Sequence, residues 1–243
     1  MPVVKVKNLY YAYPEGKSVL KGLNFEVKAG ETLAIIGLSG SGKTTLCQCL
    51  CGLAPHVLGG SMEGQVLIKG QATAAYRLPQ LACEIGMVFQ NPDMQLVCTT
   101  VEDEIAFAPE NLCLSPEEIR RRVEEILRLL GFSHLRQKNP AALSGGQRQL
   151  LSLGAVLALH PSILVLDEPM ALLDGKGRRL VREILLSLRK EGKTLILVDH
   201  DVENVDFADR FLVMENGEII CLDRPAAVMA DKEFLHRHQL FFG

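Results

Sequence analysis

The sequence predicts an α/β fold, in which buried parallel strands alternate with helices and a run of helices is inserted. The main evidence is three apolar stretches that end in polar residues: TLAIIG (32–37), SILVLDEP (162–169) and KTLILVDH (193–200). Continuous apolar runs of this length are typical of strands that are buried on both faces of a parallel sheet. Helical patterns lie between these strands, and such alternation indicates the α/β class.

The N-terminal third follows a different pattern. Apolar and polar residues alternate in VVKVKNLYYAY (3–13), VLKGLNFEVKAG (19–30) and QVLIKGQ (65–71), as they do in strands with one buried face. The glycine-rich stretch GLAPHVLGGSMEG (52–64) is expected to form a loop. A further strand is expected at 85–89.

The middle of the chain is predicted to be helical. Ser115 is placed to cap a helix, and Glu118 is placed to complete a capping box with it. The apolar stretch 150–159 is expected to be a buried helix, and 177–190 an amphipathic one. No strand pattern occurs from about 100 to 155, so these helices are expected to form a subdomain.

Composition narrows the class of protein. The 243 residues include 26 basic and 29 acidic side chains, and this slight acidity argues against a nucleic-acid partner. No secretory signal and no apolar run of ~20 residues occurs, so reduced cysteines in a cytoplasmic protein are expected. The alternating cysteines of CQCLC (47–51) predict either a metal or redox site or small apolar filler on a buried helix.

A glycine-rich stretch, GLSGSGKTT (37–45), lies between a buried strand and a predicted helix. It matches the phosphate-binding P-loop pattern, in which glycines let successive N–H groups point at one anion. Lys43 is expected to contact the outer phosphates, and Thr44 to offer a hydroxyl to Mg²⁺. The alternative is a glycine turn with an accidental lysine. The predicted nucleotide-binding residues are Gly37, Leu38, Ser39, Gly40, Ser41, Gly42, Lys43, Thr44 and Thr45.

Polar residues at other strand ends would complete such a site. Asp167 can hold Mg²⁺, and Glu168 can take the proton of an attacking water, unless it is only a charge at a strand end. His200 ends the last buried strand, where a γ-phosphate would lie. Gln90 leaves the strand at 85–89 in the same way, and its amide can bind the metal or orient water.

A second serine and glycine stretch, LSGGQ (143–147), precedes the buried helix and is a second candidate anion pocket. The chain resembles the ATP-binding cassette (ABC) ATPases over nearly its whole length. The motifs that carry the resemblance are the P-loop, Gln90, LSGGQ, ILVLDE, ALLD (which ends at Asp174) and His200. The resemblance implies a P-loop NTPase (RecA-like) core with an N-terminal antiparallel β-subdomain and an inserted α-helical subdomain. The chain is then a single domain, with core segments 1–90 and 156–243 and a helical subdomain at about 91–155.

The resemblance also implies what each motif does. The chain would be a Mg²⁺-dependent ATPase with Glu168 and His200 as catalytic residues and Asp174 in the D-loop. Its cofactors would be ATP and Mg²⁺, with the metal on Thr44, Gln90 and Asp167. In this family the LSGGQ signature faces ATP held by a second subunit, which here can be a second copy or a paralogue. The residues implied to act on the partner's ATP are Ser144, Gly145, Gly146 and Gln147.

Two further expectations concern the surroundings of the nucleotide. Tyr13 stands where the family places an aromatic ring against adenine, although Tyr10 or Tyr11 could stack instead. Asp199 precedes the histidine where the family usually has threonine, and its carboxylate could raise the pKa of the histidine or repel phosphate. Whether Asp199 alters the hydrolysis rate is open at this point.

A narrower resemblance lies in VFQNPDMQLVCTTVEDEIAFAPENL (88–112), which is similar to the ATPases of energy-coupling-factor (ECF) transporters. It implies an ATPase pair on the cytoplasmic face of the membrane, docked on a transmembrane coupling protein, with a separate membrane protein that binds a vitamin or transition-metal ion. The alternative is ordinary helical-subdomain surface. The rival functions are a soluble ABC ATPase of DNA repair or translation and a non-hydrolysing interaction module. Against the first, long coiled coils, zinc hooks and basic linkers are lacking.

Overall fold

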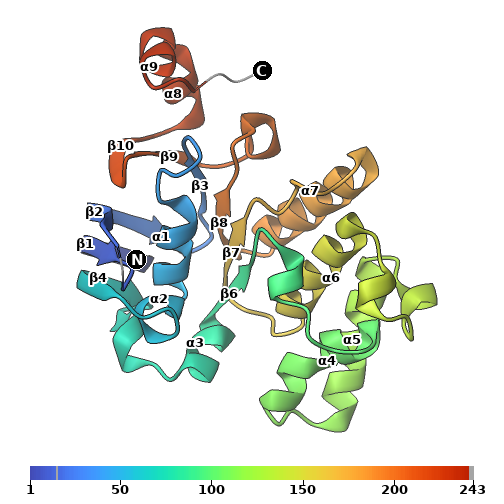
Figure 1. The fold of residues 1–243 in the computed structure, drawn as a ribbon. Helices are drawn as coiled ribbons and strands as arrows, with labels where there is room; N and C mark the ends of the chain where they lie inside the picture. The colour runs from blue at the N-terminus through green and yellow to red at the C-terminus, as the bar shows by residue number, and fades with distance from the viewer. Residues whose placement is uncertain (15, 241–243) are drawn as a thin grey trace.

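A computed structural model describes residues 1–14 and 16–240 and places the strands in two sheets. The smaller sheet is antiparallel and comes from the N-terminal third of the chain (Figure 1). Its strands, in spatial order, are β2 (Ser18–Lys28), β1 (Pro2–Ala12), β4 (Ser61–Ile68) and β5 (Gln71–Ala72).

The larger sheet carries the buried strands. Its order is β10 (Glu218–Asp223), β9 (Arg210–Glu215), β3 (Thr32–Ile36), β8 (Thr194–Val198), β7 (Ile163–Asp167) and β6 (Ile85–Val88). All neighbours are parallel except β10, which runs antiparallel to β9. Because parallel strands end at the same edge, the residues that follow β3, β6, β7 and β8 come together there.

Helices cover both faces of the larger sheet (Figure 1). On the side of the antiparallel sheet lie α1 (Lys43–Leu50), α2 (Leu53–His56) and α3 (Leu78–Glu84). The other side carries α4 (Val101–Asn111), α5 (Pro116–Leu129), α6 (Gly145–Leu157) and α7 (Gly175–Lys190). The last helices of the described residues are α8 (Pro225–Ala230) and α9 (Lys232–Arg237), which extend beyond β9 and β10 (Figure 1).

The core divides into two hydrophobic clusters, one on each face of the larger sheet. Ala34 and Ile36 of β3 belong to the cluster with α4–α7, whereas Leu33 and Ile35 belong to the cluster with α1 and the antiparallel sheet. Successive side chains of a strand point to opposite faces, so a strand with apolar residues at every position serves both cores. The continuous apolar runs in the sequence have this physical cause.

The predicted α/β fold class is confirmed, and several local predictions are corrected. The stretch 52–64 is not wholly a loop, because it contains α2 and the start of β4. The capping box at α5 is half formed: the Glu118 amide donates to Ser115 Oγ at 3.3 Å, but the Glu118 carboxylate pairs with Arg121 and Arg122 instead. Strands β9 and β10 and helices α8 and α9 are not among the predicted elements. Among the described residues, no helix is both long and apolar enough to cross a membrane.

Candidate functional site

The loop between β3 and α1 has a backbone that requires glycine. Gly37 has φ 150°, and a Cβ there would lie 2.2 Å from the carbonyl oxygen of Met214 in β9. Gly42 has φ 100°, and a Cβ would lie 3.0 Å from Leu20 Cδ2. The loop is therefore compressed between two strands, and it curls directly into the N-terminus of α1, where the helix dipole favours an anion.

Lys43 lies in this loop with its ammonium group folded back onto the backbone. Its Nζ donates to the carbonyl oxygens of Gly37 at 2.7 Å and Leu38 at 2.8 Å. Burial lowers the pKa of Lys43, while the nearby carboxylates of Glu168 and Asp167 act in the opposite direction. The lysine is thus a cation held in place before any phosphate arrives.

A pocket of about 250 Å³ brings the predicted site residues together. The P-loop, Gln90 at the end of β6 and Glu168 after β7 all line it. Sequence reasoning missed Val19 of β2, which also lines the pocket, because a valine in an alternating strand carries no chemical pattern. The full lining is Val19, Ser39, Gly40, Gly42, Lys43, Thr44, Thr45, Gln90 and Glu168.

Asp167 is suited to hold a cation beside this pocket. Its side chain is buried and accepts a hydrogen bond from Thr44, but Oδ2 has no hydrogen-bond partner among the described residues. Burial raises the pKa of Asp167, although the Thr44 hydrogen bond opposes this shift. A buried carboxylate oxygen without a partner is costly unless a ligand satisfies it, and Mg²⁺ prefers carboxylate and hydroxyl oxygens. Thr44 and Asp167 therefore fit the predicted metal.

Glu168 is contacted by two other predicted residues. Gln90 Nε2 donates to Glu168 Oε2 at 2.9 Å, and His200 Nδ1 lies 3.6 Å from Glu168 Oε1. The backbone of Glu168 has φ 47°, a left-handed conformation that side-chain-bearing residues rarely adopt. Its amide donates to the carbonyl oxygen of Val198 in β8, which fixes the turn. Three polar side chains from three strand ends thus meet at one point.

The Asp199 carboxylate has a structural role in the loop that carries His200. Asp199 is buried, and its carboxylate accepts hydrogen bonds from the Asp201 amide at 2.9 Å and from Asn204 Nδ2 at 3.1 Å. Burial raises the pKa of Asp199. The carboxylate thus braces the loop after β8, and His200 itself is exposed.

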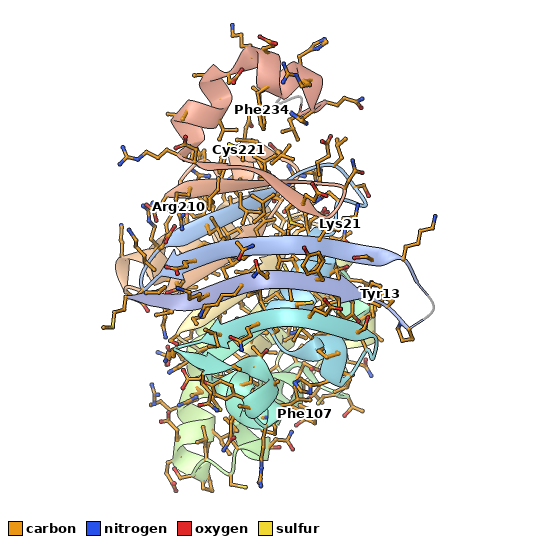
Figure 2. The ribbon with its side chains drawn as sticks, turned by 90° about the vertical axis from the view of Figure 1, so that its left-hand side faces the viewer. Tyr13, Lys21, Phe107, Arg210, Cys221 and Phe234 are labelled. Carbon is orange, nitrogen blue, oxygen red and sulfur yellow. The ribbon has the colours of Figure 1, made fainter. Side chains whose placement is uncertain are left out.

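Tyr13 lies at the end of the antiparallel sheet next to α1 (Figure 2). Its hydroxyl donates to Gln48 Oε1 at 2.7 Å and lies 3.1 Å from Thr45 Oγ1. Its ring meets the ring of Tyr11 edge-on, with centroids 5.0 Å apart. Tyr11 itself is buried and Tyr10 is partly exposed, so of these two alternatives only Tyr10 offers ring surface to solvent.

The signature residues do not line the pocket of their own chain. Ser144 caps α6: its Oγ accepts from the Gln147 amide at 3.2 Å, and Gln147 Oε1 accepts from the Ser144 amide at 3.0 Å. Gly145 faces open space, whereas a Cβ on Gly146 would lie 3.2 Å from the carbonyl oxygen of Leu172. Asp174 caps α7 by accepting from the Gly177 amide at 2.7 Å. The N-terminus of α6 thus faces outward at residues 144–147.

A protein-family model described as "ABC transporter" matches residues 20–171 of this chain. The energy-coupling factor transporter ATP-binding protein EcfA of Methanocaldococcus jannaschii is 39% identical over 243 residues, covering 99% of this chain and 85% of that protein. A longer relative from Methanosarcina acetivorans is 41% identical over 239 residues, which cover 97% of this chain but 37% of the relative. The chain therefore spans little more than a third of that relative's length.

Two solved ATP-binding cassette structures have the same fold as this chain. CbiO1 of Clostridium perfringens, described as part of the ABC transporter complex CbiONQ, superposes with a TM-score of 0.81 at 36% identity, covering 98% of this chain and 95% of that chain. The ATP-binding cassette MJ0796, in a dimeric post-hydrolysis state bound to ADP and phosphate, superposes with a TM-score of 0.81 at 29% identity. That match covers 91% of this chain and 98% of the cassette.

Proposed function

We propose, because this chain belongs to the ABC transporter ATPases, that it binds and hydrolyses ATP to energise a membrane uptake transporter of the ECF type. The observation that carries the proposal is the pocket in which Lys43, Gln90 and Glu168 meet at the edge of the parallel sheet. A phosphate-binding loop, a candidate metal ligand and a candidate base within one pocket are the parts that phosphoryl transfer to water requires.

In the proposed reaction, Glu168 accepts a proton from the water that attacks the γ-phosphate. The bond between the γ-phosphorus and the bridging oxygen breaks, which leaves ADP and phosphate. Lys43 leaves the backbone carbonyls that it now contacts and balances charge on the phosphates. Gln90 first has to release Glu168 Oε2, because that oxygen accepts its amide hydrogen in this structure. His200 lies close enough to Glu168 to contact the same phosphate.

The proposed metal is Mg²⁺, held by Thr44, Gln90 and Asp167. When bound, it supplies positive charge that neutralises the phosphate oxygens. The unpartnered oxygen of Asp167 supports this ligand set. The remaining contacts to nucleotide are assigned to residues 37–45 and to Tyr13, whose hydroxyl lies 3.1 Å from Thr45 Oγ1.

The proposed second half of each site comes from another cassette, either a copy of this chain or a paralogue. Residues 144–147 present the N-terminus of α6 outward, and Gly145 leaves space for an approaching phosphate. The D-loop residue Asp174 caps α7 next to this turn. Two chains would thus clamp ATP between the P-loop of one and residues 144–147 of the other, and hydrolysis would loosen the clamp.

The proposed helical subdomain, residues 91–155, offers a surface for a transmembrane coupling protein. A groove of about 310 Å³ lies where this subdomain meets the core. It is lined mostly by apolar side chains, from α4 and α6 and, in the core, from α3 and β6, and Phe107 is 47% exposed at its edge (Figure 2). Met94 and Val97 are exposed on the preceding loop. This groove, with the likeness to EcfA and CbiO1, supports a peripheral position on the cytoplasmic face of the membrane and a separate protein that binds a vitamin or transition-metal ion.

The first test of the proposal is Glu168→Gln in the purified chain. The variant is expected to bind ATP like the parent, while phosphate release falls by about 10²–10⁴-fold, the usual effect of losing a general base. Equal rates in parent and variant would contradict the assignment of Glu168. Removal of Mg²⁺ with EDTA should stop phosphate release from the parent.

The second test concerns the transporter. Co-expression with a transmembrane coupling protein of the ECF class should bring the chain into the membrane fraction. Recovery with nucleic acid instead would favour the soluble alternative in DNA repair or translation.

A further inference from the structure

Gln149 is one of two buried polar residues of helix α6, the other being Ser152. It is 2% exposed and lies in the second turn of the helix, two positions after the outward-facing residues 144–147. Burying an amide is unfavourable unless its hydrogen bonds are satisfied. Gln149 meets only half of this requirement, because Nε2 has a partner and Oε1 has none among the described residues.

The partner of Gln149 is the residue before Gln90. Gln149 Nε2 donates to the carbonyl oxygen of Phe89 at 3.3 Å. The amide of Phe89 donates to Gln95 Oε1 at 3.1 Å, so side-chain amides hold both polar groups of this residue. Gln90 then donates to Glu168. A continuous chain of contacts therefore runs from the candidate base, through Gln90 and Phe89, to the helix that carries residues 144–147.

A second contact lies beside the first. Arg148 Nε is 2.9 Å from Asp93 Oδ1, and the Arg148 guanidinium also donates to the carbonyl oxygen of Leu143 at 3.0 Å. The Nε–H does not point at the carboxylate, so the contact with Asp93 is ionic rather than a directed hydrogen bond. Asp93 belongs to the same loop as Gln90. The loop is thus attached to α6 at two points, one buried and one exposed.

We propose that Gln149 is a positioning residue that couples the two nucleotide sites of the ATPase pair through one chain. This inference rests on the proposed function, in which Gln90 serves the chain's own ATP and residues 144–147 serve the partner's ATP. When Gln90 leaves Glu168 for the metal, the Phe89 carbonyl moves with it and pulls on α6. The unpartnered Oε1 of Gln149 leaves room for a second hydrogen-bond arrangement after that movement.

The test compares Gln149→Met with Ser152→Ala in the purified ATPase. Methionine keeps the length and packing of glutamine but removes its hydrogen-bonding groups. The variant is expected to bind ATP within about two-fold of the parent and to lose about 2- to 30-fold in kcat, the range that network couplings span. Its rate should also lose any cooperative dependence on ATP concentration. Ser152 is the matched control, because it is a buried residue of the same helix whose hydroxyl has no hydrogen-bond partner among the described residues.

The outcomes separate this inference from the proposed function. Phosphate release by the parent reports on the proposed function alone, whereas the ratio of variant to parent reports on Gln149. A parent-like kcat in Gln149→Met, or an equal loss in Ser152→Ala, would overturn the inference. Should Gln149→Met fail to fold, Asp93→Asn decides, because this exposed substitution removes the ionic contact without touching the core. It is expected to lower kcat in the same direction, and an unchanged kcat would overturn the inference.

Discussion

Glu168 has an unfavourable backbone conformation that places its carboxylate in the candidate nucleotide site. A left-handed conformation costs a side-chain-bearing residue roughly 1–2 kcal/mol, and the hydrogen bond from its amide to Val198 holds it there. The turn directs the carboxylate towards Gln90 and His200. The sequence ILVLDE indicated a carboxylate at a strand end, but only the folded chain shows the strained backbone.

The P-loop glycines differ in what they can tolerate. Gly37→Ala is expected to lower the melting temperature well beyond Gly40→Ala, because its Cβ would overlap the Met214 carbonyl, whereas a Cβ on Gly40 meets open space. Gly40→Ala still pays the left-handed penalty of about 1–2 kcal/mol at φ 79°. Thermal unfolding followed by circular dichroism would measure both variants. Equal melting temperatures would show that the strands around Gly37 move apart easily.

The three alternating cysteines of residues 47–51 are expected to be inert. Burial raises the pKa of Cys49 to about 12 and also raises those of Cys47 and Cys51, so the reactive thiolates are scarce near neutral pH. A thiol reagent at pH 8 should modify exposed Cys113 and reach these three only after unfolding. Because the folded pKa is the higher one, their contribution to stability is lost as pH rises from about 9 towards 12. Rapid labelling of all seven cysteines in the folded chain would contradict this.

At the scale of elements, helix α5 depends on its N-cap residue, Ser115, more than on the Glu118 carboxylate of its predicted capping box. Ser115→Ala removes the acceptor for the Glu118 amide and is expected to cost about 1 kcal/mol, or a fall of about 2–4 °C in melting temperature. Ser115→Asp keeps an acceptor and serves as the control. A melting temperature unchanged in Ser115→Ala would show that tertiary packing alone fixes the end of α5.

The Glu118 carboxylate illustrates why sequence patterns predict a helix better than they predict the hydrogen-bond partners of its side chains. Hydrogen bonds from Arg121 and then Arg122 hold the pKa of Glu118 at about 2. Both arginines lie one turn ahead on the same helix, where guanidinium groups outcompete a single backbone N–H for the carboxylate. The helix, its cap and its approximate end were predictable from spacing, whereas the choice between two nearby partners was not.

For the whole molecule, the sharpest prediction concerns Gly145. The Glu168→Gln chain with Mg²⁺ and ATP is expected to dimerise, either with itself or with a paralogous cassette, as measured by light scattering. Adding Gly145→Asp should abolish that dimer, because the new carboxylate would repel the partner's phosphates. The monomer should stay folded, since a Cβ at this position meets nothing and aspartate is favourable at a helix N-terminus.

Two outcomes would contradict this prediction. A Glu168→Gln chain that stays monomeric with ATP, both alone and with its natural partner cassette, would remove the shared site. A dimer that persists unchanged with Gly145→Asp would show that residues 144–147 lie outside the interface.

The sequence by itself determined the fold class and the chemistry of the strand ends. Continuous apolar runs such as TLAIIG predict a strand that is buried on both faces of a parallel sheet. The spacing of glycine and lysine in residues 37–45 predicts a loop whose backbone N–H groups bind phosphate. Both features depend on residues that are adjacent in the sequence, so a short segment is enough to predict them.

Tertiary structure alone decided which distant groups meet. Gln90 contacts Glu168 across 78 positions of sequence, and Gln149 contacts Phe89 across 60. The same holds for the carbonyl of Met214 that compresses Gly37, and for the place of β9 between β10 and β3 in the larger sheet. Such pairings arise from the order in which parallel strands assemble, which no periodicity within a single segment encodes.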